Sequence, residues 1–339
     1  MRLTKMMEKG YSKKRSFSWK LLFLFAIYQL FFAVVCAPLL IFYGPFENIK
    51  RIVVGTAMST MRHQYIATTF LSEGEIQRIL KKTEGAGLNF LDEDLNNIQV
   101  AHYNDKQIDR YNIHTNKFDG YLLEIKDPTR IKVAYTKKLG KEGQRTSEMA
   151  KAHGAVAAIN GGSFADKSED GKLYAGTGAF PGGIVISEGK VIYKDVKEDI
   201  KLEVVAFNQA GILIVGEHSL QDLRRMGATE AISFRPPTLI INGQGQIAKD
   251  DNNGFNPRTA IGQKSDGTIL LLVIDGRKGF KLGASLYDVQ QILLQHGAWN
   301  AGNLDGGSSS TMYYKGQVIN DPSDWDGERT VATALYVTP

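Results

Sequence analysis

The chain has 339 residues, a formal net charge of +5 and a single cysteine, Cys36. This length exceeds that of a typical single domain. One cysteine cannot form an internal disulfide, and the sequence after residue 36 has no thiol to act as a nucleophile or a metal ligand. The positive charge lies in residues 1–20, which carry +6, so the rest of the chain sums to −1. No basic footprint for nucleic acid remains, and we expect no nucleic-acid partner.

Residues 21–43 contain no charged side chain. As a helix they would reach about 34 Å, enough to cross a hydrocarbon core of about 30 Å. The basic tail before them predicts a cytoplasmic N-terminus and an extracytoplasmic remainder, in a single-pass protein of the cell membrane. A cleaved signal peptide is the alternative. An uncleaved anchor is favoured because the apolar stretch is long and no small-x-small cleavage site lies near residues 36–38.

Residues 44–84 are predicted to form a juxtamembrane stalk. Ser72 and Glu75 form a capping-box pattern, and Ile76, Ile79 and Leu80 share one face of the helix that would follow. Residues 85–119 are polar and weakly periodic, which indicates a linker or an irregular start to the domain.

Residues 120–339 are dense in predicted elements. Strands are expected at 121–125 and 131–135, around a turn at Asp127 and Pro128. Hairpins are expected within 182–193, 204–216 and 258–276, and helices within 146–154, 219–228 and 285–297. A short buried strand should follow the first helix and end at Asn160. Strands outnumber helices and mostly pair locally, so we predict an α+β fold with a mixed, hairpin-rich sheet core and a few packed helices.

Polar residues and glycines follow three of the predicted buried strands: Asn160 in "INGG", Asp275 in "IDGR" and Asp305 in "NLDGG". The first and last belong to segments that resemble each other, 153–163 and 296–308, although chance explains so short a match equally well. In open sheets that contain parallel strands, ligands bind at the carboxyl ends of the strands. We therefore expect a shared site there, with Arg258 as an anion clamp at the start of a strand. A single aspartate after an apolar run otherwise marks only where a strand reaches water.

Several of these motifs together resemble the phosphodiester glycosidase family. They are "INGGSF", "GAFPGGIVIS", "NPRTAIG", "VIDGR", "NLDGGSSSTM" and "ERTVATALYV", in family order across about residues 120–339. The animal member of this family removes N-acetylglucosamine from phosphate-linked mannose, and bacterial members are associated with exopolysaccharides. The resemblance implies a hydrolase that cleaves the glycosidic C–O bond of a sugar-1-phosphodiester in a cell-envelope or extracellular glycopolymer.

The chemistry of such a bond suggests roles for these residues. The leaving phosphate is a weak base, since the second pKa of a phosphate monoester is about 6. Cleavage therefore needs a cation at the phosphate and a carboxylate facing the anomeric carbon or its attacking water. We predict Arg258 as the cation, alone or together with Arg277 or Arg329. Asp305 and Asp275 are predicted as base or nucleophile and second carboxylate, in an order left open. The residues predicted to bind substrate are Asn160, Gly161, Gly162, Arg277, Asn303, Gly306, Gly307, Ser308, Ser309 and Arg329.

Alternatives remain at this stage. Residues 308–310 could supply a serine nucleophile, although no histidine or lysine lies near them in the sequence. No cofactor is predicted; a divalent metal held by Asp275 and Asp305 stays open, without ligand spacing to support it. From another class of protein, a non-catalytic envelope module could bind phosphorylated polysaccharide or assist its assembly. His153 and His296 precede helix-ending glycines, and both are interpreted as structural.

Overall fold

The computed structural model describes residues 18–58, 63–84, 93–167, 173–174, 176–234, 238–249 and 254–339. The chain divides into two compact units, Met1–Lys50 and Arg51–Pro339. Most of the predicted basic tail and residues 85–92 of the predicted linker lie outside the described residues.

The smaller unit contains helix α1 (Trp19–Tyr43), which begins two residues before the predicted span. Ser18 caps it: its hydroxyl accepts a hydrogen bond from the N–H of Leu21 at 3.4 Å. Among the described helices, α1 is the one long and apolar enough to cross a membrane, and a signal sequence near an N-terminus has the same properties. Helix α2 (Glu47–Met58) continues into the larger unit.

The predicted stalk contains α3 (Tyr65–Thr68) and α4 (Glu73–Glu84). The capping box is confirmed. The N–H of Glu75 donates to the Ser72 hydroxyl at 3.3 Å, and the N–H of Ser72 donates to the Glu75 carboxylate at 3.0 Å. The next apolar position, Ile76, is buried. Ser72 and Glu75 thus cap the start of α4, as the local sequence predicts.

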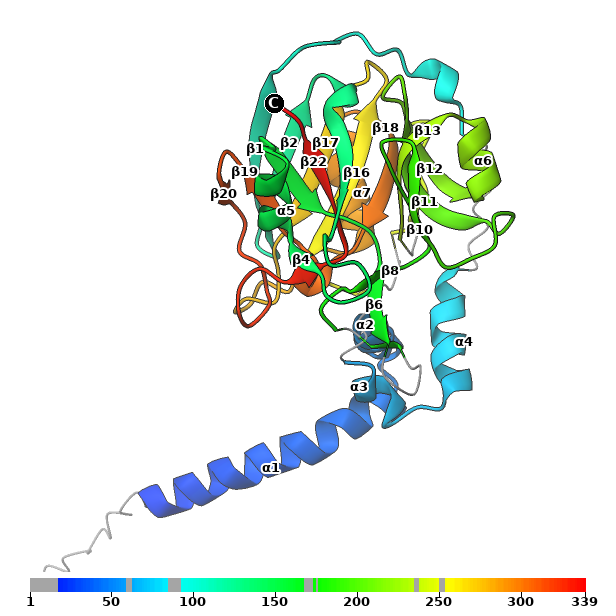
Figure 1. Ribbon diagram of the computed structural model, residues 1–339. Helices are drawn as coiled ribbons and strands as arrows, with labels where there is room; N and C mark the ends of the chain where they lie inside the picture. The colour runs from blue at the N-terminus through cyan, green and yellow to red at the C-terminus, as the bar shows by residue number, and fades with distance from the viewer. Residues whose placement is uncertain are drawn as a thin grey trace, which may run out of the picture. The chain divides into compact units, whose positions relative to one another are not determined.

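Three main sheets and two small ones build the larger unit (Figure 1). The seven-stranded sheet has the order β1 (Ile108–His114), β2 (Asp119–Ile125), β17 (Ile269–Ile274), β16 (Arg258–Lys264), β18 (Ala298–Leu304), β14 (Thr238–Ile241) and β15 (Gln244–Gly245). The sheet named here the β11 sheet has the order β10 (Lys190–Lys194), β9 (Ile184–Ser187), β13 (Ala228–Ser233), β11 (Leu202–Asn208) and β12 (Leu213–His218). The β5 sheet has the order β20 (Gln317–Val318), β19 (Met312–Tyr314), β5 (Ala157–Asn160), β22 (Thr333–Val337) and β3 (Ile131–Tyr135).

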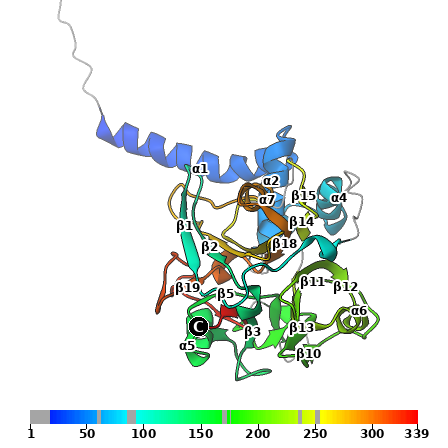
Figure 2. The same cartoon turned by 90° about the horizontal axis from the view of Figure 1, so that it is seen from above.

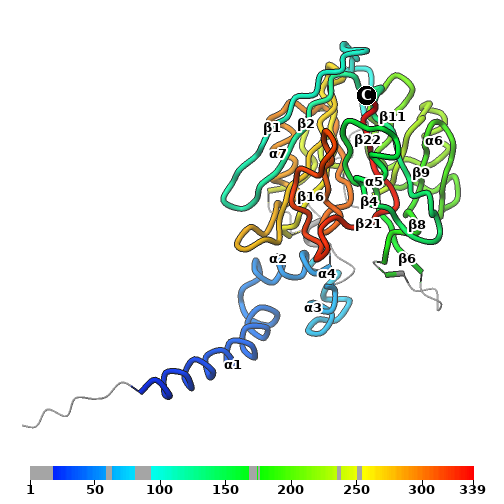
Figure 3. Tube along the Cα trace, turned by 60° about the vertical axis from the view of Figure 1, so that its left-hand side comes forward, coloured from blue at the N-terminus to red at the C-terminus, as the bar shows by residue number. Residues whose placement is uncertain are grey.

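The two small sheets lie at one end of this unit (Figures 1 and 3). They are β21 (Thr330–Val331) with β4 (Gln144–Arg145), and β7 (Leu173–Tyr174) with β6 (Phe164–Lys167) and β8 (Phe180–Pro181). Short 3-10 helices occur at η1 (Leu95–Asn97), η2 (Pro128–Arg130) and η3 (Gly307–Ser309).

The main core lies where the three large sheets face one another (Figure 2). Leu271, Ile159 and Val205 represent the three sheets in this cluster, and each is almost completely buried. One helix covers the outer face of each sheet: α7 (Leu286–Gln295) the seven-stranded sheet, α5 (Thr146–Ala152) the β5 sheet and α6 (Leu220–Arg225) the β11 sheet. The predicted α+β class is confirmed, as are the three predicted hairpins, β9–β10, β11–β12 and β16–β17.

One premise of the sequence analysis is wrong. Every strand pair recorded among the described residues is antiparallel, so no parallel neighbours bring their carboxyl ends together. The strand ends still meet, for another reason. β16 lies between β17 and β18 and runs opposite to both, so β17 and β18 end at the same edge, where β16 begins.

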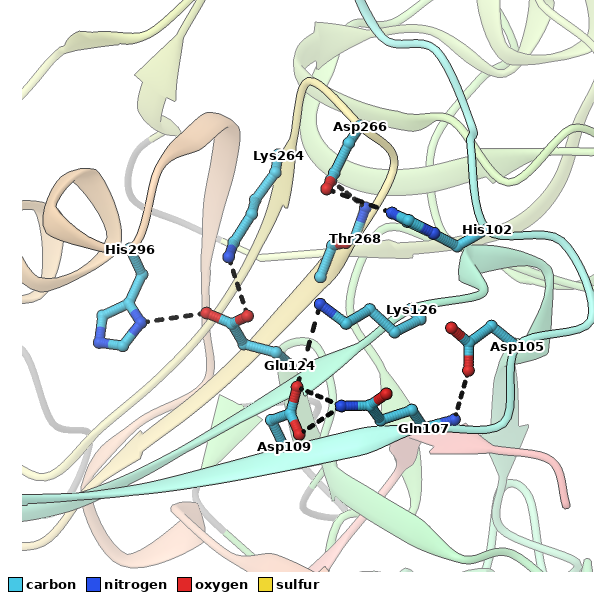
Figure 4. A network of polar contacts seen from close by, with 10 residues as sticks. All are labelled: His102, Asp105, Gln107, Asp109, Glu124, Lys126, Lys264, Asp266, Thr268 and His296. Carbon is cyan, nitrogen blue, oxygen red and sulfur yellow. Dashed lines mark hydrogen bonds and ion pairs between the residues drawn. The ribbon is translucent and has the colours of Figure 1, made fainter.

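The opposite end of the seven-stranded sheet carries a network of polar contacts (Figure 4). The Glu124 carboxylate accepts a hydrogen bond from Lys264 Nζ at 2.8 Å and lies 3.2 Å from Nδ1 of His296. His153, the other histidine interpreted as structural, stacks on Tyr336 with ring centroids 4.6 Å apart. Both histidines thus contact scaffold residues.

Candidate functional site

Three residues singled out from the sequence lie at one edge of the seven-stranded sheet. Arg258 opens β16 and is opposite Ile274, the last residue of β17, so Asp275 follows directly. Thr259 is opposite Leu304, the last residue of β18, so Asp305 follows there. Adjacent strands lie about 4.8 Å apart, which places the two aspartate backbones about 10 Å from each other across β16.

The two similar segments of the sequence also meet at this edge. The N–H of Asp305 donates to the Gly161 carbonyl at 3.1 Å, and Nδ2 of Asn160 donates to the Asp305 carbonyl at 2.5 Å. The Asn160 side-chain oxygen accepts from the Thr259 hydroxyl at 2.7 Å and from the Thr311 N–H at 3.1 Å. Asn160 is completely buried, so its amide holds the β5 sheet to the seven-stranded sheet and fixes the backbone of Asp305.

Asp305 has the most perturbed carboxyl group of this edge. Dense packing of protein atoms raises its pKa to about 6, although the residue is only half-buried. Hydrogen bonds from the Ser309 side chain and the Gly306 N–H, together with the charges of Arg329 and Arg277, act in the opposite direction. Asp305 is therefore a carboxyl group that changes protonation close to neutral pH and faces two cations.

The two arginines come from different loops. Arg329 donates to the Ser308 hydroxyl at 3.2 Å and to the Gly176 carbonyl at 2.9 Å, and its guanidinium lies 5.0 Å from the ring centroid of Phe164. Contact with an aromatic face and two hydrogen bonds hold a guanidinium in one orientation. These contacts join the η3 turn to the β6–β8 region.

Arg277 is held from the other side. Its Nη2 donates to the Asn256 side-chain oxygen at 2.7 Å, and burial lowers its pKa while the charge of Asp305 raises it. Its backbone has φ of 60°, an uncommon conformation for a residue other than glycine. A Cβ on Gly307 would lie 3.3 Å from the Arg277 guanidinium, so a glycine at position 307 gives this side chain its room.

Asp275 lies in a different environment. Burial raises its pKa, and hydrogen bonds from the Asn320 side chain and the Asp321 N–H oppose this effect. Nδ2 of Asn320 donates to Oδ1 at 2.9 Å, and the N–H of Asp321 lies 3.1 Å from both carboxylate oxygens. Asp275 therefore anchors the loop that begins at Asn320.

Arg258 differs from its predicted role as the anion clamp. Its Nε donates to the Ala284 carbonyl at 3.1 Å and its Nη2 to the Gly254 carbonyl at 2.9 Å, and only 7% of the residue is exposed. The charges recorded on Asp305 come from Arg329 and Arg277. Arg258 thus donates to the backbone of neighbouring loops, and the cations that act on Asp305 are Arg329 and Arg277, which the sequence analysis named beside Arg258.

Other predicted substrate contacts also have protein partners. The Gly307 N–H donates to the Pro257 carbonyl at 2.8 Å and the Gly306 N–H to the Asp305 carboxylate, so both N–H groups have acceptors within the protein. Gly161 and Gly162 lie against Thr333 and Ser233, where a Cβ would come within 2.5 Å of oxygen atoms. Asn303 is buried on the sheet face that α7 covers, because Ala301 of the same face belongs to that core.

The sequence analysis missed Asn256, Asn320 and Asp321. Asn256 begins the quoted motif "NPRTAIG", in which only Pro257 and Arg258 were interpreted. Asn320 and Asp321 precede Pro322, a turn signal that marks a loop without indicating its partner. In the parts of the chain that the structure describes, no three histidine, cysteine or acidic side chains group as metal ligands would.

A hairpin-rich α+β domain with a carboxylate under the influence of two arginines at a sheet edge has groups that suit the binding and hydrolysis of an anionic substrate. The structure resembles the catalytic domain of zebrafish N-acetylglucosamine-1-phosphodiester alpha-N-acetylglucosaminidase, described as auto-inhibited by its pro-peptide, with a TM-score of 0.57 and 22% identity over 71% of this chain and 87% of that one. At that identity the likeness shows the fold. The model of the phosphodiester glycosidase family matches residues 153–338, more than half of the chain. The chain belongs to the phosphodiester glycosidase family.

Two curated relatives share shorter segments. The uncharacterized protein YomE, derived from the SPbeta prophage of Bacillus subtilis (strain 168), is 42% identical over 88 residues, which are 26% of this chain and 14% of that protein. The N-acetylglucosamine-1-phosphodiester alpha-N-acetylglucosaminidase of Bos taurus is 35% identical over 91 residues, 25% of this chain and 17% of that protein. The matched segments thus span less than a fifth of the length of these relatives.

Proposed function

We propose that this chain is a membrane-anchored, extracytoplasmic hydrolase that cleaves the glycosidic C–O bond of a sugar-1-phosphodiester in a cell-envelope or extracellular glycopolymer. The observation that carries the proposal is the environment of Asp305, whose pKa of about 6 and two facing arginines combine a base near neutrality with an anion site. Membership of the family supports the reaction type.

The reaction explains why one site needs both charges. Departure of the phosphate leaves an anion on a weak base, so a cation stabilises it better than a proton donor would. Arg329 and Arg277 are the cations proposed here. The anomeric carbon gains positive character as the bond breaks, and a carboxylate stabilises that charge, attacks the carbon or activates water.

Asp305 is proposed as the base or nucleophile, because it combines solvent contact with a pKa close to the pH at which such groups act. Asp275 is proposed as a positioning residue. The Asp275 carboxylate accepts hydrogen bonds from Asn320 and Asp321. Strand β16 lies between Asp275 and Asp305. Ser308 and Ser309 are proposed to line the phosphate position, since each contacts one of the charged groups.

The location is proposed from α1 and the basic tail. Seven basic residues against one acid within residues 1–20 favour a cytoplasmic N-terminus. The proposed domains are a tail at 1–20, an anchor at 21–43, a stalk at 44–84, a linker or domain start at 85–119 and the glycosidase domain at 120–339. Protease added to intact spheroplasts should degrade the domain; protection, or a mature chain that starts after residue 43, contradicts this topology.

The test of the activity is product identity. The full chain in detergent is incubated with a panel of sugar-1-phosphodiesters, and free sugar with a phosphomonoester is the expected outcome. Sugar-1-phosphate with an alcohol would instead mean P–O cleavage by a phosphodiesterase. Binding without turnover, unchanged in Asp305→Asn, would favour a non-catalytic envelope module.

A further inference from the structure

Two aromatic side chains stand out on the larger unit by their exposure. Phe280 is 101% exposed and Trp325 is 88% exposed, more than any other large apolar side chain recorded in that unit. Large rings in contact with water lose the free energy that burial would give them, about 25 cal/mol for each Å². Two such rings on neighbouring loops therefore indicate a surface that binds a ligand.

Both rings lie at the tips of turns beside the site. Phe280 is in a turn that the backbones of Lys278 and Lys281 close with hydrogen bonds of 3.1 and 3.0 Å, directly after Arg277. Trp325 is in a turn closed between Asp324 and Gly327. The Lys278 ammonium lies 2.5 Å from the Asp321 carboxylate, and this ion pair joins the two loops.

The loop that carries Trp325 is anchored at both ends by site residues. At its start, the Asp321 N–H donates to the Asp275 carboxylate at 3.1 Å. At its end, Arg329 donates to the Ser308 hydroxyl at 3.2 Å. Only seven residues separate these anchors, so Trp325 cannot lie far from the edge that holds Asp305.

The charges of this loop restrict the ligand. Residues 320–329 contain four acidic side chains and one basic one, and Asp324 and Asp326 flank Trp325 directly. Carboxylates accept hydrogen bonds from hydroxyl groups, while an aromatic face packs against an apolar C–H surface. A sugar ring offers both. The two lysines beside Phe280 are paired, Lys278 with Asp321 and Lys281 with Asp119, and Arg145 lies 3.5 Å from Asp326. With these cations paired, the surface has no excess of positive charge to attract an anionic bilayer or a chain of phosphates.

We propose that Phe280 and Trp325 form a platform for a neutral sugar next to the scissile phosphodiester, so that the substrate is an oligosaccharide or polysaccharide and extends past the site. The inference rests on the proposed function for the position of the scissile bond. The platform predicts a preference for longer substrates, which Arg329, Arg277 and Asp305 alone would not produce, since they engage only the charged group.

Kinetics measure the length preference. Three substrates are compared. The first is the methyl phosphodiester of N-acetylglucosamine-1-phosphate. The second carries three additional neutral sugars on the N-acetylglucosamine side of the phosphate, and the third carries them on the other side. We expect the full chain to prefer one extended diester about tenfold in kcat/KM, which corresponds to about 1.4 kcal/mol. Trp325→Ala should lose that preference, and Trp325→Phe should keep most of it.

Tyr103→Ala is the matched control, because Tyr103 is 52% exposed and its hydroxyl donates to the Ala210 carbonyl, in a turn beside the opposite end of the sheet. An equal ratio in Trp325→Ala and in the unchanged chain overturns the proposal.

A binding measurement separates this inference from the proposed function. The chain has three tryptophans, so Trp19→Phe with Trp299→Phe leaves Trp325 as the single emitter. In nanodiscs, a saturable change of its emission on addition of a neutral tetrasaccharide such as chitotetraose is expected, with Phe280→Ala weakening the binding several-fold. That result supports the platform even if no diester is hydrolysed. No response to neutral oligosaccharides, or quenching by brominated lipids that places the ring in the bilayer, overturns it.

Discussion

The segments 153–163 and 296–308 have nearly the same local structure and different roles. Each begins at the end of a helix, with His153 or His296 at the C-cap and a glycine of positive φ after it, and each continues into a buried strand. Both then reach a polar residue followed by two glycines. In the first segment that residue is Asn160, which is completely buried, and in the second it is Asp305, which keeps contact with solvent.

The difference between an amide and a carboxylate explains the two roles. A buried amide can donate and accept, and Asn160 does both, toward Asp305, Thr259 and Thr311. A carboxylate only accepts and carries a charge whose burial is costly, so it needs cations or water. The first segment thus fixes the backbone of this sheet edge, and the second supplies the carboxylate that is proposed to react.

Exchange of the reactive group gives the largest expected effect. Asp305→Asn keeps the shape and removes the charge, and we expect hydrolysis to fall by about 10²–10⁴-fold if Asp305 is the base and by more if it is the nucleophile. Initial rates on a cleaved sugar-1-phosphodiester measure this. Asp266→Asn, in the hairpin turn at the opposite end of the sheet, is the control and should keep its rate. Near-full activity in Asp305→Asn would mean that another group does the chemistry.

The reverse exchange tests the building segment. Asn160→Asp would place a carboxylate 2.5 Å from the Asp305 carbonyl oxygen in a position without solvent contact. We expect a loss of about 3–5 kcal/mol in the free energy of unfolding, as for an uncompensated buried charge. Urea denaturation measures it, with Asn112→Asp on the exposed face of β1 as a control expected within about 0.5 kcal/mol. A small loss in both variants would show that the amide does not hold the two sheets together.

Arg329 and Arg258 allow the proposed site and the scaffold to be tested with the same substitution. Arg329→Lys removes the planar fork between Ser308 and Gly176, and we expect kcat/KM to fall about 10–100-fold with little loss of stability. Arg258→Lys should do the reverse, since its guanidinium donates to two backbone carbonyls in the interior. Steady-state kinetics and thermal unfolding of the two variants measure the contrast. A larger kinetic defect in Arg258→Lys would restore the sequence-based assignment of Arg258 as the clamp.

The pH dependence follows from the raised pKa of Asp305. A base or nucleophile acts in its deprotonated form, so under the proposed role of Asp305 kcat/KM should fall about tenfold per pH unit below the pKa of about 6. The raised pKa of Asp305 also affects the stability of the fold, and here deprotonation is unfavourable. The folded state binds the proton more tightly than the unfolded state, so stability decreases as pH rises from the usual aspartate pKa to about 6. Asp305→Asn should therefore be more stable than the unchanged chain at pH 8, by roughly 1–3 kcal/mol, and equal to it at pH 3.5. Equal stability at both pH values contradicts the raised pKa.

The smallest expected effect is that of replacing the glycine that follows the helix in each of the two segments. Gly154 and Gly297 have φ of 60° and 81°, and a Cβ at either position would meet no atom closer than 3.9 Å. Gly154→Ala and Gly297→Ala should therefore each cost only about 1 kcal/mol, the strain of a left-handed residue. Chemical denaturation measures both. A much larger loss in one variant would indicate that the two helix ends are not equivalent.

The sequence predicted what depends on neighbours along the chain. The cap of α4 is an example, because the Ser72 and Glu75 side chains each accept a hydrogen bond from the other's backbone N–H, at 3.3 and 3.0 Å, within one turn. The β16–β17 hairpin is another, since its turn residues lie between its strands. Arg258, Asp275 and Asp305 lie at one edge of the sheet, but the premise of parallel strands from which this was expected is wrong.

The roles of the charged residues depend on distant partners, and local patterns do not contain them. Asp275 is bound by Asn320, 45 residues away, and Arg329 by the Gly176 carbonyl, 153 residues away. An arginine at the start of a strand has the same sequence pattern whether its guanidinium faces a ligand or, like Arg258, the carbonyls of two loops. Only the packing of those loops decides between the alternatives.

The position of β16 between β17 and β18 has a consequence for how such a domain can diversify. The edge that holds the charged residues is fixed by backbone pairing deep in the sheet, whereas the turns that carry Phe280 and Trp325 leave that edge and return to it. Insertions or exchanges in these turns would alter the outer contacts while the hydrophobic clusters of the three sheets stay intact. Chimaeras that exchange residues 278–281 or 323–327 would therefore change the outer surface of the domain while the backbone pairing of β16 with β17 and β18 is kept.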